Sequence, residues 1–145
     1  MKISTKGRYA VRMMIDLAAY DQGAPVKVKD IAKRQDISEK YLEQIIADLN
    51  RAGLVKSIRG AKGGYQLALE PKDCTAGMIL RAVEGNLSPV DCVGEKPGNC
   101  ENSTACASMR LWEKLYEAIN GVLEHTTLAD LLEWHNELQT DQYII

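Results

Sequence analysis

Residues 28–69 read VKDIAKRQDISEKYLEQIIADLNRAGLVKSIRGAKGGYQLAL, and this stretch decides the fold. It opens with a short helical segment at about 28–34, which the tight connection 35–37 joins to a longer helical segment at about 39–52. Ser38 is placed to cap the longer segment, because its hydroxyl can accept a hydrogen bond from a free amide of the first turn. Gly53 is placed to end it. We therefore expect two helices joined by a short turn.

After Gly53 the apolar residues alternate instead of recurring at helical spacing. Residues 54–58 and 65–69 are short runs typical of strands, and the connection 59–64 reads RGAKGG. Its glycines permit the positive φ angles that a hairpin turn needs, and Arg59 and Lys62 give it a basic tip. A helix at about 7–20 precedes the pair, so the order is helix, helix, helix, wing. This order predicts a mainly α fold, a winged helix-turn-helix with a small β-hairpin wing.

Residues 73–145 add a second set of helices to the winged unit. We expect a helix at about 75–83, an aperiodic loop over 85–106, a long helix at about 107–124 and a last helix to about 139. Thr127 and Asp130 resemble a capping box that opens the last helix. The long helix bears a wide apolar stripe with few partners left in the chain, which predicts a long C-terminal dimerisation helix; ordinary core packing is the alternative. The expected regions are a winged helix-turn-helix over 1–72, a helix and loop over 73–106, and the dimerisation and C-terminal helices over 107–145.

The net charge of -2 conceals an uneven distribution. Residues 1–72 hold 14 Lys and Arg against 8 Asp and Glu, whereas residues 73–145 hold 4 against 12. A basic half next to an acidic half indicates that the first half meets a polyanion; chance clustering on a solvated surface is the alternative. No apolar run approaches the ~18 residues that span a bilayer, and the first residues lack the apolar stretch of a secretion signal. We expect a cytoplasmic protein with no membrane partner.

The longer of the two helices has the properties of a recognition helix, which fits the major groove and brings side chains near its N-terminus to base edges. Gln44 can pair with adenine, Glu43 can accept from cytosine, and Lys40 can reach guanine or a phosphate. Arg59 of the hairpin can enter a narrow minor groove, where the negative potential is strongest. A helix-turn-helix used only for protein contacts is the alternative. The residues expected to contact double-stranded operator DNA are Ser4, Lys6, Arg8, Ser38, Glu39, Lys40, Tyr41, Glu43, Gln44, Lys56, Arg59, Gly60, Lys62 and Gly63.

The chain has four cysteines, Cys74, Cys92, Cys100 and Cys106. In a reducing cytoplasm an even count is weak evidence for disulfides. Three thiols close together in a polar loop indicate metal ligands or a redox switch, with zinc or free thiols as alternatives. Cys74 comes just before a helix and is expected to pack in the core. An enzyme is not expected, because no Ser-His-Asp set or phosphate-binding loop is visible and the chain has two histidines.

Three separated stretches of the chain resemble one family of regulators. Residues 2–11 read KISTKGRYAV, residues 41–44 read YLEQ, and residues 53–65 read GLVKSIRGAKGGY. They are similar to the winged-helix transcriptional regulators that include the iron-sulfur cluster regulator IscR, the nitric-oxide sensor NsrR and the cysteine-metabolism repressor CymR. The resemblance spans nearly the whole chain. It implies a homodimeric repressor that binds operator DNA under the control of a cluster or a metabolic signal.

The resemblance also implies a cofactor. In cluster-bearing members three cysteines before the dimerisation helix hold a 2Fe-2S cluster, and the matching residues here are Cys92, Cys100 and Cys106. The fourth ligand is open. In some relatives the fourth ligand is a histidine three residues after the last cysteine, and the residue at that position here is Met109. In the nitric-oxide-sensing branch it can be a residue near the start of the first helix, and the residue here is Arg8, which stays protonated. The remaining candidates in the loop are Asp91, Glu95, Glu101 and Asn102, whereas His125 and His135 lie farther along the chain.

Other stretches are closer to the cysteine-metabolism branch, which lacks the cysteine trio. They are TAGMI at 75–79, LSPV at 87–90 and YII at 143–145. Two functions are therefore expected as alternatives. The first is a sequence-specific repressor that senses iron-sulfur, redox or nitric-oxide status through a 2Fe-2S cluster. The second is a cluster-free regulator of cysteine or sulfur metabolism, controlled by binding to a cysteine-biosynthesis enzyme.

Overall fold

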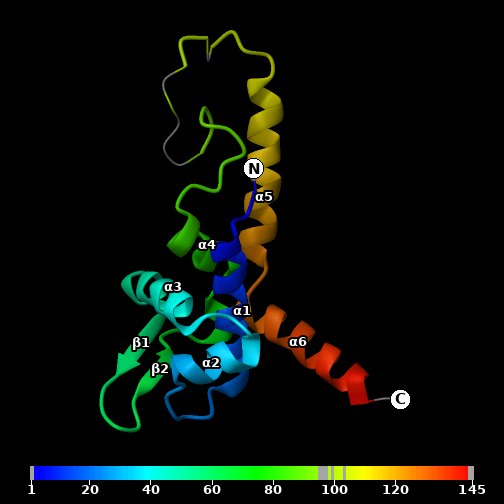
Figure 1. Ribbon diagram of the computed structural model, residues 1–145. Helices are drawn as coiled ribbons and strands as arrows, with labels where there is room; N and C mark the ends of the chain where they lie inside the picture. Colours follow the sequence, from blue (N-terminus) through cyan, green and yellow to red (C-terminus); the bar gives the residue numbers. More distant parts are fainter. Residues whose placement is uncertain (1, 95–97, 99, 103, 144–145) are drawn as a thin grey trace.

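Figure 1 shows the computed structural model, which describes residues 2–94, 98, 100–102 and 104–143. The candidate ligand Glu95 and the final residues 144–145 lie outside the described residues. A winged body at the base carries one helix that stands upright beside a long loop and a second helix that leaves the body at an angle. The elements are α1 (Thr5–Tyr20), α2 (Val28–Gln35), α3 (Glu39–Arg51), β1 (Val55–Ile58), β2 (Gly64–Leu67), η1 (Pro71–Asp73), α4 (Ala76–Glu84), α5 (Met109–His125) and α6 (Leu128–Tyr143).

Helix α1 forms the centre of the winged body. Its apolar residues recur at helical spacing, and Ala10, Met13, Met14 and Leu17 are fully buried. Helices α2, α3, α4 and α6 all contact α1. Because burying a large apolar side chain contributes about 1.5–3 kcal/mol relative to leaving it exposed, this stripe is a main source of stability for the fold.

A buried ion pair fixes α2 on α1. Asp16 is 2% exposed, and its carboxylate accepts hydrogen bonds from the Arg34 guanidinium at 2.7 and 3.1 Å and from the Gln35 amide at 2.9 Å. The Arg34 guanidinium also lies 3.7 Å from the centre of the Tyr20 ring. Its hydrogen bond to Asp16 raises the pKa of Arg34. Both carboxylate oxygens of Asp16 thus accept hydrogen bonds, which offset the cost of burying this polar group.

The helix-turn-helix has the caps that the sequence predicts. The turn between α2 and α3 is made at Asp36, whose φ of 53° is left-handed. Ser38 caps α3, because its Oγ accepts from the Tyr41 amide at 3.2 Å. At the other end Gly53 has a φ of 78°, and the Leu54 amide reaches back to the carbonyl of Leu49 at 3.0 Å. These contacts confirm the predicted start and end of α3.

The wing is an antiparallel pair in which Ile58 of β1 lies opposite Gly64 of β2. Val26, just before α2, adds a bridge to Tyr65 with hydrogen bonds of 2.9 and 2.8 Å. Gly64 is required at this crossing, because a Cβ there would lie 2.5 Å from the Val26 carbonyl oxygen. At the tip, the φ of 112° at Gly60 is one that side chains rarely permit. The hairpin confirms the predicted wing, although β2 ends at Leu67, two residues earlier than expected.

Helix α4 joins the winged body to the C-terminal helices. Cys74 is 1% exposed, which confirms its predicted place in the core, and burial raises the pKa of its thiol to about 11. Its carbonyl accepts from the Leu128 amide at the start of α6, at 2.7 Å. Arg81 of α4 pairs with Glu124 of α5 and donates to the Asn120 side chain at 3.2 Å. Helix α5 is therefore attached to the body through α4, whereas α6 is attached through Cys74 and through its direct contact with α1.

Helix α6 starts at the predicted capping box. The Thr127 amide donates to the Asp130 carboxylate at 2.9 Å, and the Asp130 amide donates to the Thr127 hydroxyl at 3.1 Å. The helix then continues to Tyr143, four residues beyond the predicted end. Residues 139–143 contain neither Gly nor Pro, so no residue interrupts the backbone hydrogen bonds after the apolar spacing ends.

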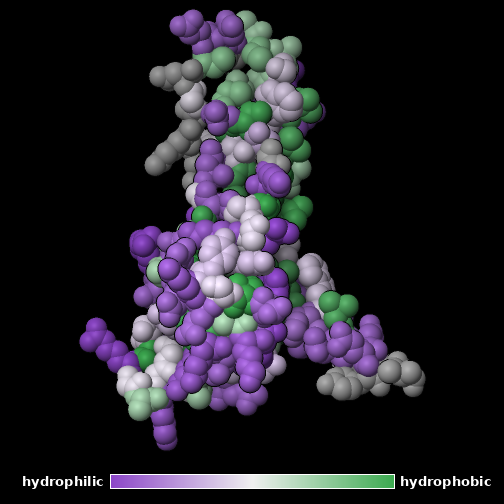
Figure 2. All heavy atoms as spheres, in the orientation of Figure 1, coloured by the Kyte–Doolittle hydropathy of each residue, from purple (hydrophilic) through white to green (hydrophobic). Residues whose placement is uncertain are grey.

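The two C-terminal helices expose apolar side chains. Figure 2 shows hydrophobic residues along the upright column that α5 forms, whereas hydrophilic residues cover most of the winged body. No helix in the described residues is both long and apolar enough to cross a membrane. The exposed large apolar residues of the column and of α6 are Leu111 at 57%, Leu115 at 42%, Val122 at 66%, Trp134 at 52% and Leu138 at 63%.

Candidate nucleic-acid interface

The N-terminal end of α3 presents polar side chains to solvent. Glu39, Lys40, Glu43 and Gln44 are exposed, whereas the apolar residues of α3 are buried against the body. Among the described residues, Lys40, Glu43 and Gln44 have no hydrogen-bond or ion-pair partner. Their donors and acceptors are therefore free in the described part of the single chain, and their contact with base edges stays a prediction.

Tyr41 has a second role besides the predicted one. It is half-buried, and its ring packs edge-on against Tyr9 of α1 with the ring centres 5.7 Å apart. The Arg12 guanidinium lies 5.3 Å from the centre of the Tyr9 ring. The aromatic pair sets the position of the first turn of α3 on α1, and a DNA contact of Tyr41 stays a prediction.

The wing supplies the basic residues of the site. Lys56, Arg59, Gly60 and Lys62 are exposed, and Gly63 is half-buried with its amide bonded to the Gly60 carbonyl at 3.0 Å. In the part of the chain that the structure describes, the three cationic side chains of the wing have no acidic partner. The wing follows α3 directly and lies beside it in Figure 1, so the two can meet one duplex together.

The N-terminal residues expected at the phosphates all have partners within the chain. Ser4 caps α1 by accepting from the Gly7 amide at 3.0 Å, and the Lys6 ammonium lies 2.6 Å from the Asp48 carboxylate of α3. The Arg8 guanidinium, which is exposed, donates to the Thr5 hydroxyl at 3.0 Å. These residues lie on the first turn of α1, which adjoins α3.

Asp48 is a residue of this site that the sequence analysis missed. Its carboxylate joins Lys6 of α1 to Arg51 of α3, at 2.6 and 3.0 Å. The hydrogen bond from Lys6, and then that from Arg51, holds the pKa of Asp48 below its ordinary value. The pairing with Arg51 follows from their three-residue spacing on a helix, whereas the contact with Lys6 depends on the tertiary fold.

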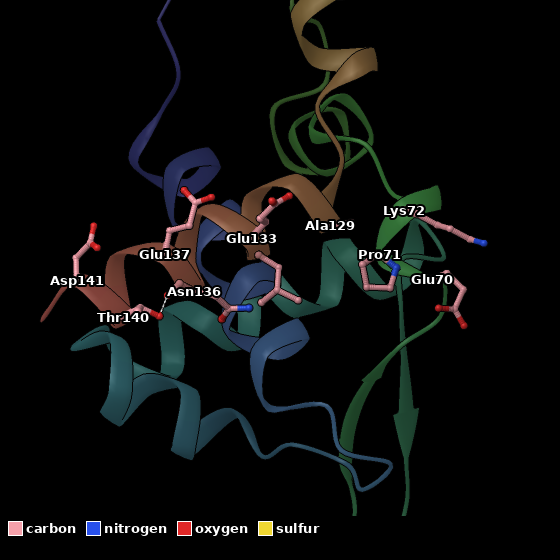
Figure 3. Close-up of a pocket in the computed structure, with 10 residues that line it drawn as sticks. Glu70, Pro71, Lys72, Ala129, Glu133, Asn136, Glu137, Thr140 and Asp141 are labelled. Atoms are coloured by element: carbon pink, nitrogen blue, oxygen red, sulfur yellow. Dashed lines mark hydrogen bonds between the residues drawn. The ribbon is translucent and has the colours of Figure 1, made fainter. Parts of the chain in front are cut away.

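Carboxylates line a hollow of about 710 Å³ between η1 and α6. Figure 3 shows Glu133, Glu137 and Asp141 on α6 along one side of it and Glu70 and Lys72 at the other. Lys72 is the basic residue in this lining. A surface so rich in carboxylates repels phosphates, which leaves the face of α3 and the wing as the candidate DNA site.

The three loop cysteines differ in their surroundings. Cys92 is half-buried in a hollow of about 370 Å³ against α5, and Cys100 is exposed. The Cys106 sulfur lies 3.0 Å from the Ser108 hydroxyl, and this hydrogen bond, followed by one from the Met109 amide, lowers the pKa of the Cys106 thiol. Thiols suit iron chemically. However, no three His, Cys, Asp or Glu side chains in the described ranges are gathered closely enough to hold a metal ion.

The candidate fourth ligands are spread over several surfaces. Asp91, Glu101 and Asn102 are exposed in the loop. The Nδ1 atom of His125 is 2.8 Å from the Gly121 carbonyl of its own helix. His135 lines a separate hollow with Asp16, Arg34 and other residues of α1, α2 and α6. The described geometry thus offers thiol donors but does not bring them into a formed cluster site.

Comparisons with known proteins identify the family and the fold of the chain. The Rrf2 family, described as an iron-dependent transcriptional regulator, matches residues 3–134. The HTH-type transcriptional regulator CymR of Bacillus subtilis is 47% identical over 135 residues, which cover 92% of this chain and 91% of that protein. A solved structure of CymR, the global cysteine regulator of B. subtilis, has a TM-score of 0.77 at 46% identity and covers 92% of this chain and 98% of its own.

A second solved structure belongs to the other named branch. IscR of T. potens has a TM-score of 0.76 at 45% identity, and the match covers 96% of this chain and 91% of that one. The curated relatives are named as transcriptional regulators and not as enzymes, which confirms the prediction from the sequence that the chain is not an enzyme. The two-stranded wing, the helix-turn-helix and these relatives together confirm the predicted fold class. The chain belongs to the Rrf2 family of transcriptional regulators.

Proposed function

We propose that the chain is a repressor that binds operator DNA as a homodimer, with α3 in the major groove and the wing in the adjoining minor groove. The observation that carries the proposal is the exposure of Lys40, Glu43 and Gln44 at the start of α3, next to a basic wing. Two copies of α3 would read a pseudo-palindromic site in successive major grooves, about 34 Å apart.

The experiment is a selection of duplexes from a random pool, followed by titration of the selected site against a scrambled one. A specific regulator binds its site roughly 10³-fold or more tightly than random duplex at physiological salt. Gln44→Ala should relax the preference at one position of each half-site, since a bidentate base contact is worth about 1–3 kcal/mol. Equal affinity for both duplexes would contradict the proposal.

The proposal includes a sensor in the loop between α4 and α5. A 2Fe-2S cluster held by Cys92, Cys100 and Cys106 would supply a redox-active group that also reacts with nitric oxide. Support comes from the chemistry of the donors: three thiols share one loop, and the hydrogen bond with Ser108 lowers the pKa of the Cys106 thiol, which raises the fraction of the metal-binding thiolate. In this proposal the state of the loop alters the placement of the two recognition helices, and hence the operator affinity.

Anaerobic purification tests the sensor. Wild type should be coloured and contain iron and acid-labile sulfide in equal amounts, whereas Cys92→Ala should contain much less of both. Cys74→Ala is the matched control, because that thiol is buried in the core and away from the loop. Iron contents that are equally low in all three proteins would contradict a cluster at these cysteines.

A cluster-free regulator of cysteine metabolism is the second candidate. It is favoured by the placement of the loop cysteines, which do not come together in the described residues, and by the similarity to CymR. In that case the protein would be colourless and free of iron, with full operator affinity, and its partner would be a cysteine-biosynthesis enzyme. A coloured protein whose operator affinity falls when the iron is removed would contradict this candidate.

A further inference from the structure

Glu84 connects the end of α4 to the N-terminal segment of the chain. Its Oε1 atom accepts a hydrogen bond from the Ser4 amide at 3.0 Å and another from the Ser4 hydroxyl. The two residues are 80 positions apart in the sequence. The Ser4 hydroxyl in turn accepts from the Gly7 amide at 3.0 Å, so one carboxylate oxygen organises the N-cap of α1.

The carboxylate lies directly over the first turn of α1. A Cβ built on Gly7 would be 2.1 Å from the Glu84 Oε1 atom, far inside the contact distance of these atoms. Gly7 is buried, and in this arrangement its missing side chain makes room for the carboxylate. Any larger residue at position 7 must displace Glu84 or move the turn.

The same turn carries the basic residues next to the recognition helix. Lys6 reaches Asp48 of α3, and Arg8 is exposed one turn from Ser4. The position of the turn therefore determines where both cations lie relative to α3. If the first turn of α1 were flexible, it would lose conformational entropy on binding DNA. A turn that is already fixed does not incur this cost, so it binds more tightly.

We propose that Glu84 is a positioning residue for DNA binding, which holds the first turn of α1 so that Lys6 and Arg8 reach the phosphates of the operator. The inference rests on the proposed operator-binding function. Glu84 itself does not touch DNA in this proposal. Its effect passes through Ser4 and the N-cap of α1.

The experiment measures how operator affinity depends on salt. Each lost phosphate contact lowers the magnitude of the slope of log K against log salt by about 0.9, so a dimer that loses the Lys6 and Arg8 contacts of both subunits should lose about 3.6. We expect this loss in Glu84→Ala. Glu84→Gln removes the same charge but keeps an oxygen that can accept from Ser4, so it should keep the wild-type slope.

Gly7→Ala provides an independent test, because it displaces the carboxylate without changing the charge of the chain. It should reduce the slope as Glu84→Ala does, and the double variant should lose no more than either single variant. Amide exchange at Ser4 and Gly7 should become faster in both single variants. Melting curves establish that each variant is folded.

The outcomes separate this inference from the proposed function. If wild type shows no preference for any site, the proposed function fails. If wild type binds its site and Glu84→Ala loses thermal stability but keeps the salt slope, Glu84 is merely structural and the inference is wrong. A further loss in the double variant would show that Gly7→Ala acts by another route, which would also overturn it.

Discussion

Single polar residues fix the relative positions of the helices in the winged body. Asp16 holds Arg34 and Gln35 of α2, and Asp48 holds Lys6 of α1. In each case a carboxylate of one helix meets a cation of another, with at least one of the two partly buried. Such contacts add directional links between helices that also pack through their apolar side chains.

The pairing of Asp48 predicts a pH-dependent stability. Hydrogen bonds from Lys6 and Arg51 lower the pKa of Asp48 from its ordinary value of 3.8. A lowered carboxyl pKa stabilises the fold above the unfolded-state pKa, and this stabilisation is lost as the pH falls through the folded-state pKa. Asp48→Asn should therefore lower the free energy of unfolding at pH 7 by about 0.5–1 kcal/mol, and the difference from wild type should vanish well below pH 3.8.

Urea unfolding of the two proteins at a series of pH values provides the measurement. Asp21→Asn is a suitable control, because Asp21 is exposed just after α1. A difference between wild type and Asp48→Asn that stays constant down to pH 2 would refute the assigned pairing.

Arg59 is the residue of the wing on which DNA affinity should depend most. It is exposed at the hairpin tip beside Gly60, where the backbone can approach the duplex closely. Arg59→Ala should weaken operator binding by about 1–3 kcal/mol. Arg110→Ala removes the same charge from α5, at the other end of the molecule from the wing, and should have little effect in the same titration. An unchanged titration for Arg59→Ala would count against the wing assignment.

Helix α5 differs from the other α-helices because none of its residues is buried in the single chain. Leu111, Leu115 and Val122 recur at helical spacing and form one exposed apolar face. Contiguous apolar faces of this kind mark interaction surfaces in soluble proteins. The dimerisation predicted from the sequence would bury this face against its copy in a partner subunit.

The dimer interface can be tested with one substitution. In a two-fold dimer each change occurs twice, and burying one leucine contributes about 1.5–3 kcal/mol, so Leu115→Glu should remove several kcal/mol of association energy. The variant should sediment as a monomer at concentrations where wild type is a dimer. Arg110→Glu places a carboxylate on another side of α5 and should leave the dimer intact. Wild-type protein that is itself monomeric at high concentration would exclude a dimer interface on this face of α5.

The elements themselves could be predicted because their signals are local. Ser38, Gly53 and the Thr127–Asp130 box act within a few residues, and each is found in the predicted place. The contact of Glu84 with Ser4 could not be predicted, since neither residue carries a signal for a partner 80 positions away. The candidate DNA residues were recognised by their type and position in the sequence. Asp48 and Glu84, whose carboxylates hold the N-terminal turn, were not recognised, because their partners in that turn are distant in the sequence.

At the scale of the whole molecule, charge is separated along the chain. Of the 18 Lys and Arg residues, 14 lie in residues 1–72, whereas 12 of the 20 Asp and Glu residues lie in residues 73–145. A polyanion is therefore attracted to the face of α3 and the wing and repelled by the carboxylates between η1 and α6, which orients the protein as it approaches DNA.

This separation predicts a strong salt dependence of operator binding. Lys6, Arg8, Lys56 and Lys62 from two subunits would give about eight phosphate contacts, and hence a slope of log K against log salt of about -7. Lys62→Ala should reduce the magnitude of this slope by about 2, because it removes one contact from each subunit. Fluorescence anisotropy between about 50 and 200 mM salt covers the range over which affinity should fall by roughly 10³–10⁵-fold. A slope near zero would be incompatible with phosphate contacts by these residues.

The position of α5 and α6 outside the winged body has a practical consequence for fluorescence measurements. The chain has two tryptophans, Trp112, half-buried on α5, and Trp134, 52% exposed on α6, so both indole rings lie outside the winged body. Their emission spectra therefore report the polarity around the C-terminal helices. A wavelength shift on adding operator would come from rearrangement in that half of the molecule, whereas quenching by iodide would measure directly how far a second subunit shields the protruding helix.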